Sequence, residues 1–219
     1  MTAPVNPNPP EPAGHEREPV NPASLEHDGA ITEFSASDCS RTNLVVRGIS
    51  ASSGELQRVN LSASTLDAGR FTDLEFRDCD LANLRSIRTT LTRVRIRGGR
   101  LTGMVLLESA LYDVTFEGCR IDLSSFADSK LVRVRFQDCL LTGTSLMNSK
   151  CESVTFEDCR MTEADFRGAK MKDCQIRRCD LIGIEGTAGL RGVAMEWADI
   201  VEMAPVWAAA LGLVVIDTE

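Results

Sequence analysis

Residues 91–96 read LTRVRI, and similar stretches return at a constant spacing, at 111–116 (LYDVTF), 131–136 (LVRVRF) and 151–156 (CESVTF). The fourth position of each stretch is valine, and the sixth is isoleucine or phenylalanine. Self-similarity at a fixed period indicates an architecture in which one structural unit stacks on the next. The sequence therefore predicts a unit that runs from the start of one such stretch to the start of the next.

A shorter period of five residues sets where the apolar side chains fall. Counting every fifth residue from Ile31 to Leu181, only Arg41 and Ser86 are not apolar. A second column, which precedes the first by two residues, contains no charged residue. A period of five fits neither an α-helix nor a flat strand. It fits a chain that turns a corner every five residues, so four sides make one 20-residue coil.

Stacking these coils buries their inward faces in one continuous core. We therefore expect an all-β, quadrilateral β-helix over residues 30–190. With neighbouring coils spaced as paired strands are, about eight coils would form a rod of roughly 38 Å. The triplets at 79–81 (CDL), 164–166 (ADF) and 179–181 (CDL) resemble the repeat of the pentapeptide-repeat family. That resemblance implies a right-handed β-helix.

Residues 1–29 differ in composition from the rest of the chain. Seven of the eight prolines lie at or before Pro22, among few apolar side chains. Such a segment buries too little surface to offset its ordering entropy, so residues 1–29 are predicted to be a disordered, proline-rich tail. The chain has no apolar signal sequence and no run long enough to span a bilayer. We expect a soluble, cytoplasmic protein that does not contact membranes.

Residues 191–219 leave the repeat and are predicted to form a capping and dimerisation module. Asp199 and Glu202 resemble a capping box that opens a helix ending near Leu211, although Pro205 would fit only in a first turn. Residues 213–216 read LVVI and predict a short strand. One face of the helix is apolar and is expected to form a homodimer contact; its residues are Ile200, Met203, Trp207 and Leu211.

The cysteines follow the 20-residue register. Six of the eight occupy one inward column, namely Cys39, Cys79, Cys119, Cys139, Cys159 and Cys179. A narrow inner corner suits a small, slightly apolar side chain, so we expect buried, reduced thiols. A ladder along one axis does not bring four zinc ligands together. A disulfide between neighbours such as Cys119 and Cys139 is the alternative.

Catalysis is not expected, because both histidines, His15 and His27, lie in the predicted tail. We expect no metal and no cofactor. Residues 51–190 hold 20 acidic and 20 basic side chains. Along one outward column acids and bases alternate, which favours pairing between coils over direct nucleic-acid binding; its members are Asp73, Arg93, Asp113, Arg133, Ser153 and Asp173.

A second outward column is unexpectedly apolar. Ile87, Leu107, Ala127 and Met147 share one position on successive coils, and Val105 lies beside them. Apolar surface of this kind marks interaction sites. The residues Ile87, Val105, Leu107 and Met147 are therefore candidates for a protein-partner interface, with coverage by one of the chain's own termini as the alternative.

The C-terminal module resembles that of the Qnr and MfpA quinolone-resistance group, through residues 189–193 (GLRGV) and 211–215 (LGLVV). In that group the resemblance implies a C-terminally joined dimer that mimics DNA and binds DNA gyrase. Two hypotheses follow. The first is a non-enzymatic protein-binding scaffold whose partner is not named by the sequence. The second is a DNA mimic that binds gyrase and modulates fluoroquinolone susceptibility. The balanced charge of the rod favours the first.

Overall fold

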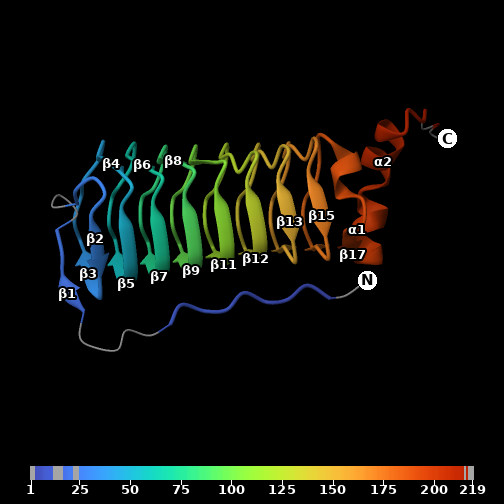
Figure 1. Cartoon of the computed structure of the whole chain (residues 1–219). Helices are drawn as coiled ribbons and strands as arrows, with labels where there is room; N and C mark the ends of the chain where they lie inside the picture. The colour runs from blue at the N-terminus through green and yellow to red at the C-terminus, as the bar shows by residue number, and fades with distance from the viewer. Residues whose placement is uncertain (1–2, 12–16, 22–24, 215, 217–219) are drawn as a thin grey trace.

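The protein is a β-solenoid in a computed structural model that describes residues 3–11, 17–21, 25–214 and 216 (Figure 1). Its longer sheet runs the length of the rod in the order β1-β3-β5-β7-β9-β11-β12-β14-β16-β17, and every pairing is parallel. The path comprises β1 (Glu18–Pro19), β3 (Phe34–Ser37), β5 (Ser50–Gln57), β7 (Arg70–Arg77), β9 (Thr90–Arg97), β11 (Ala110–Glu117), β12 (Lys130–Gln137), β14 (Thr155–Glu157), β16 (Gln175–Arg177) and β17 (Ala194–Met195).

Shorter strands complete the coils. A second parallel sheet follows another side of the rod in the order β10-β8-β6-β4. Its members are β4 (Val45–Arg47), β6 (Thr65–Asp67), β8 (Arg85–Ile87) and β10 (Val105–Leu107). Three further strands join the longer sheet beside its main path. They are β2 (Ala30–Thr32), β13 (Lys150–Glu152) and β15 (Lys170–Lys172).

The pairing register confirms the predicted period of four sides per coil. Val114 in β11 lies opposite Val94 in β9 and Val134 in β12. In the same strands Phe116 lies opposite Ile96 and Phe136. Each coil therefore places an equivalent residue, 20 positions further along the chain, over its predecessor. Counted from β3, the sheet path has a ninth strand, β17, which the segment after the repeat supplies.

The corners of the coils have a backbone signature. From Asp28 to Gly183, every fifth residue has a positive φ, between 49° and 73°. Most of these residues are not glycine, and Leu123, with φ of 56°, is among them. A left-handed conformation is unfavourable for such residues. It is maintained because the corner N–H groups bond to the next coil, as Asp138 N does to Glu157 O at 3.0 Å.

The interior is packed unevenly along the rod. Phe116, Phe136 and Phe156 stack face to face, with ring centroids 4.8 and 4.9 Å apart. Phe126 meets this stack edge-on, 6.0 Å from Phe116. In the N-terminal half, where smaller residues such as Ala51 occupy the inner columns, an apolar cavity of about 100 Å³ remains. The C-terminal half is therefore the more tightly packed part of the core.

Composition predicts a disordered tail at residues 1–29, and the described parts of this segment lie against the rod. Residues 3–11 run beside the rod, and residues 17–21 lie at its first coil (Figure 1). There β1 pairs with β3, through Glu18 N to Glu33 O at 2.8 Å and Val20 N to Ser35 O at 2.7 Å. The physical reason is that an open sheet edge accepts another strand whatever its apolar content.

The C-terminal segment also differs in detail from the expected helix and strand. A 3-10 turn, η2 (Thr187–Leu190), leads through β17 into two helices, α1 (Trp197–Glu202) and α2 (Ala204–Ala210). The chain divides at Met203, and Pro205 takes the first turn of α2, where its missing N–H costs nothing. Residues 213, 214 and 216 are not in a strand, and Val215 lies outside the described residues.

Candidate interaction surfaces

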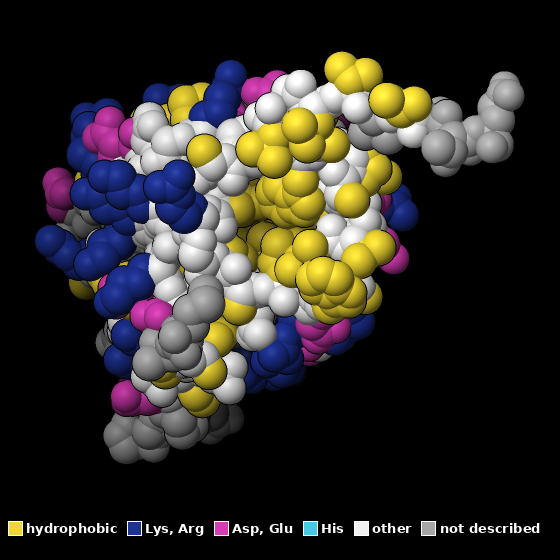
Figure 2. Space-filling view, turned by 90° about the vertical axis from the view of Figure 1, so that its right-hand side faces the viewer, with side chains coloured by type: hydrophobic (Ala, Val, Ile, Leu, Met, Phe, Trp, Pro, Cys, Tyr) yellow, Lys and Arg dark blue, Asp and Glu magenta, His cyan; other side chains and the backbone are white. Residues whose placement is uncertain are grey.

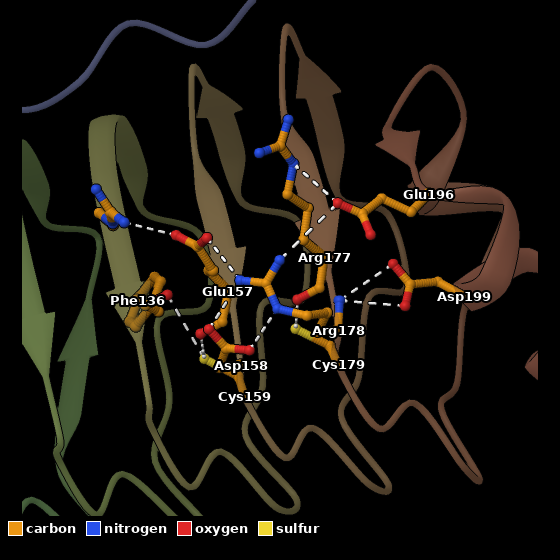
Figure 3. Close-up of polar contacts among 10 residues, drawn as sticks. Phe136, Glu157, Asp158, Cys159, Arg177, Arg178, Cys179, Glu196 and Asp199 are labelled. Atoms are coloured by element: carbon orange, nitrogen blue, oxygen red, sulfur yellow. Dashed lines mark hydrogen bonds and ion pairs between the residues drawn. The ribbon is translucent and has the colours of Figure 1, made fainter.

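The cap is fixed to the last coil by Asp199. The sequence pattern placed this residue in a capping box, but α1 begins after Glu196, and no side chain caps the helix. Instead the buried carboxylate of Asp199 accepts the backbone N–H of Arg178, with both oxygens at 3.1 Å (Figure 3). Arg178 is a corner residue with no further coil to bond to. Asp199 therefore substitutes for the carbonyl that a next coil would supply.

A charged network extends this joint. The guanidinium of Arg178 donates to Asp158 at 2.6 Å and to Glu157 at 2.7 Å, and Glu157 also accepts from Arg135 (Figure 3). Hydrogen bonding from Arg178 holds the pKa values of Asp158 and Glu157 below their ordinary range. Glu196, at the start of α1, lies 3.7 Å from Arg177. The cap is thus held by ion pairs as well as by packing.

The outer side of the cap is apolar. Figure 2 shows hydrophobic side chains gathered at the C-terminal end of the rod. Among the side chains of this end, Trp197 is 78% exposed and Leu211 is 75% exposed. The other large apolar residues exposed here are Ile200, Val201, Leu213, Val214 and Ile216. We call Trp197, Ile200, Val201 and Leu211 the cap face.

The four residues expected at a dimer contact do not all lie on the cap face. Ile200 and Leu211 are exposed there, and Trp207 is half-buried. Met203 is only 3% exposed and packs into the core of the same chain, so it is not available to a second copy. Trp197, the first residue of α1, is exposed on the cap face, whereas the sequence predicts a helix that starts after it.

The four partner candidates on the side of the rod lie in neighbouring rows. Leu107 pairs with Ile87, and Val105 pairs with Arg85, in the β8–β10 ladder. Met147 occupies the same position two coils beyond Leu107. All four side chains are half-buried. The column is therefore an outward stripe whose members partly shield one another, and it offers less free apolar surface than the cap face.

The predicted pairing of charges between coils is present. Arg93 bonds to Asp73 at 2.7 Å, and Arg133 bonds to Asp113 at 2.6 Å. On a second corner row, Arg58 bonds to Asp38 and Arg178 to Asp158, each at 2.6 Å. Asp38, Asp73, Asp113 and Asp158 are thus each bonded to an arginine of the adjacent coil.

The thiols occupy the inner corners as expected. All eight cysteines are free; seven are buried, and Cys39 is half-buried. In six of them the sulfur lies 3.2 to 3.6 Å from a carbonyl oxygen, in bonds such as Cys139 to Gln137 O and to Phe116 O. Burial raises the pKa of Cys151 to about 12. Seven of the eight thiols are therefore buried groups of the core.

Histidine, cysteine and acidic side chains form no metal-binding cluster in the described part of the chain. His27 accepts the Arg47 backbone N–H through Nδ1 at 3.0 Å, and His15 lies outside the described residues. Over residues 3–11, 17–21, 25–214 and 216, no three His, Cys, Asp or Glu side chains gather closely enough to hold a metal ion. Within the same ranges, no helix is long and apolar enough to cross a membrane.

Comparison with known proteins shows which family the repeat matches. The family model described as a pentapeptide repeat region matches residues 69–142 and 109–185, which together cover more than half of the chain. The chain belongs to the pentapeptide-repeat family. No curated protein sequence matches it.

Solved pentapeptide-repeat proteins are similar in part. HetL of the cyanobacterium Nostoc sp. strain PCC 7120, involved in regulating heterocyst differentiation, is 15% identical, with 77% of this chain and 90% of HetL covered at a TM-score of 0.45. QnrB1, a plasmid-mediated fluoroquinolone resistance protein, is 15% identical over 93% of this chain and 100% of that chain, with a TM-score of 0.42. A thylakoid-lumen member from Arabidopsis thaliana is 17% identical, covering 58% and 72% of the two chains, with a TM-score of 0.28.

Proposed function

We propose that this pentapeptide-repeat protein is a non-enzymatic, protein-binding scaffold that self-associates through its cap face. The observation that carries the proposal is the concentration of exposed apolar side chains at one end of a rod whose other large apolar residues are mostly in the core. Apolar patches of this kind are characteristic of protein–protein contacts. Trp197 is the expected anchor, because tryptophan is enriched among residues that dominate interface energy.

The geometry of the cap suits a closed dimer. The cap face lies at the end of the rod, so a two-fold contact between caps would leave both sets of coils accessible to other proteins (Figure 2). Asp199 and Arg178 fix α1 to the last coil, so the face is held in one orientation. Such pre-organisation lowers the ordering cost of association.

Light scattering on the full chain tests self-association. Wild type is expected to have the mass of a dimer, and the double variant Trp197→Glu/Leu211→Glu the mass of a monomer. Leu123→Asn is the matched control, because Leu123 is 69% exposed at a corner of the rod, away from the cap, and asparagine tolerates its positive φ. A monomeric wild type, or a dimer that survives the double substitution, would refute the proposed contact.

The stripe of Ile87, Val105, Leu107 and Met147 is the proposed contact for a different protein. Pull-down with wild type against Leu107→Asp and Met147→Asp tests it, because a charge in the centre of an apolar contact weakens binding. Loss of a specific partner from both variants supports the stripe. An unchanged set of partners counts against it.

The gyrase hypothesis requires a continuous acidic face. Asp73 and Asp113, on one corner row, are bonded to arginines of the adjacent coil, as Asp38 is on another. This pairing favours the general scaffold over DNA mimicry. The scaffold proposal expects no inhibition of gyrase supercoiling and no protection from a fluoroquinolone at micromolar protein; either effect would restore the DNA-mimic hypothesis.

A further inference from the structure

The N-terminal segment contacts the rod with a period of three residues. Within residues 3–11, Pro4, Pro7 and Pro10 are half-buried, and the other six residues are exposed. Proline fixes φ and restricts the residue before it to extended conformations. A polyproline II helix has three residues per turn. The three-residue pattern of half-buried prolines indicates that residues 3–11 form such a helix, with one edge facing the rod.

Two backbone hydrogen bonds anchor this helix. Asn8 N donates to Asp113 Oδ1 at 3.0 Å, and Glu11 N donates to Asp73 Oδ1 at 2.9 Å. Between these carboxylates lies Arg93, which bonds to Asp73 and approaches the Glu11 carboxylate at 3.7 Å. We call Asp73, Arg93, Asp113 and Arg133 the acceptor row.

The spacing of the acceptor row matches the pitch of the helix. Its two aspartates, Asp73 and Asp113, occupy the same corner of coils that are two apart. Two coils span about 9.6 Å at the spacing of paired strands. One polyproline II turn spans about 9.3 Å. Because aspartate and arginine alternate, an acceptor recurs once per turn of the peptide, in register with every third backbone N–H.

The row is also selective and pre-organised. Proline has no N–H, so the donors that reach the row are those of the residues that follow Pro7 and Pro10, namely Asn8 and Glu11. Asp73 and Asp113 are buried, and each is held by two bonds from the arginine of the next coil. The two aspartate side chains are therefore already ordered before a peptide binds, which limits the conformational entropy lost on binding.

We propose that the acceptor row is a binding site for a proline-rich partner segment in the polyproline II conformation, with backbone N–H groups three residues apart. Residues 3–11 are its resident ligand, and a partner segment must displace them. This site lies on the side of the rod, and the inference does not rest on self-association through the cap face.

A labelled peptide with the sequence of residues 3–11, followed by fluorescence anisotropy, tests the proposal on the full chain. In wild type the resident segment competes with the peptide. In the variant Asn8→Pro/Glu11→Pro the resident segment keeps its conformation but loses both donors. A hydrogen bond to a carboxylate is worth about a factor of ten in an equilibrium constant. The peptide should therefore bind the double variant at least about tenfold more tightly than wild type.

Two controls make the result specific. A peptide carrying prolines in place of Asn8 and Glu11 should lose binding to the double variant. Adding Asp73→Gly and Asp113→Gly to that variant should also abolish binding; both positions have positive φ, which glycine tolerates, and circular dichroism checks the fold. Equal binding to wild type and double variant, no binding to the double variant, or equal binding of the proline-substituted peptide would each overturn the proposal.

Discussion

Phe136 is the residue whose removal should damage the rod most. Its side chain is fully buried, and it stacks on Phe116 at 4.8 Å and on Phe156 at 4.9 Å. Phe126 meets it edge-on at 5.8 Å. Truncating a buried phenylalanine to alanine costs about 3–5 kcal/mol. Each ring pair contributes about 0.5–1.5 kcal/mol beyond area burial, so we expect Phe136→Ala to lie near the top of that range.

Phe76→Ala is the matched comparison. Phe76 occupies the same column, but it is half-buried, lines the existing cavity, and lies opposite Leu56 and Ile96 rather than other rings. Its truncation should cost about 2 kcal/mol, since less surface is lost and no ring stack is broken. Urea unfolding, followed by circular dichroism and by the fluorescence of Trp197 and Trp207, measures the loss of free energy of unfolding in both variants. Equal losses, or a smaller loss for Phe136→Ala, would refute this account of the core.

Two further predictions concern titratable groups. The hydrogen bond from Arg133 lowers the pKa of Asp113, desolvation opposes this by raising it, and the Asn8 N–H lowers it further. The pKa of Asp113 is therefore lower in the folded state than in the unfolded state. The resulting stabilisation of the fold is present above about pH 4 and is lost as pH falls through the folded-state pKa. Acid unfolding of Asp113→Asn should therefore depend less steeply on pH than that of wild type, and identical profiles would contradict the assignment. Of the eight thiols, only the half-buried Cys39 should react quickly with a thiol reagent in the native protein. All eight should react in denaturant. Fast reaction of several thiols in the native protein would show that the inner corners are accessible to solvent.

The repeating part of the molecule could be predicted from the sequence because two independent patterns, one of five residues and one of 20, indicate the same coil. Apolar residues recur at every fifth position, and similar stretches recur every 20 residues, which is once per four-sided coil. Only one arrangement of the chain buries both inner columns at these spacings. The two residues of this column that are not apolar, Arg41 and Ser86, were also visible in the sequence, and the structure explains Ser86. Ser86 sits inside the rod and bonds to Leu66 O at 2.6 Å and to Thr89 Oγ1 at 2.7 Å.

The ends could not be predicted in the same way. Asp199 and Glu202 fit a helix-capping pattern, but the unsatisfied N–H of Arg178 on the last coil takes the Asp199 carboxylate instead. Local patterns miss this, because the competing donor is 21 residues away in sequence. The proline-rich segment was likewise judged by its own composition. Its contacts depend on carboxylates of Asp73 and Asp113, which only the stacked coils bring into a row.

Small-angle X-ray scattering on the full chain tests whether the stacked rod is joined to a second copy at the cap. The eight spacings from β3 to β17 give a stack of about 38 Å per protomer. Two rods joined at their caps should give an elongated particle whose two stacks alone span about 76 Å end to end. The double substitution Trp197→Glu/Leu211→Glu should reduce this particle to a single rod. A compact particle, or a single rod for the wild type, would contradict this arrangement.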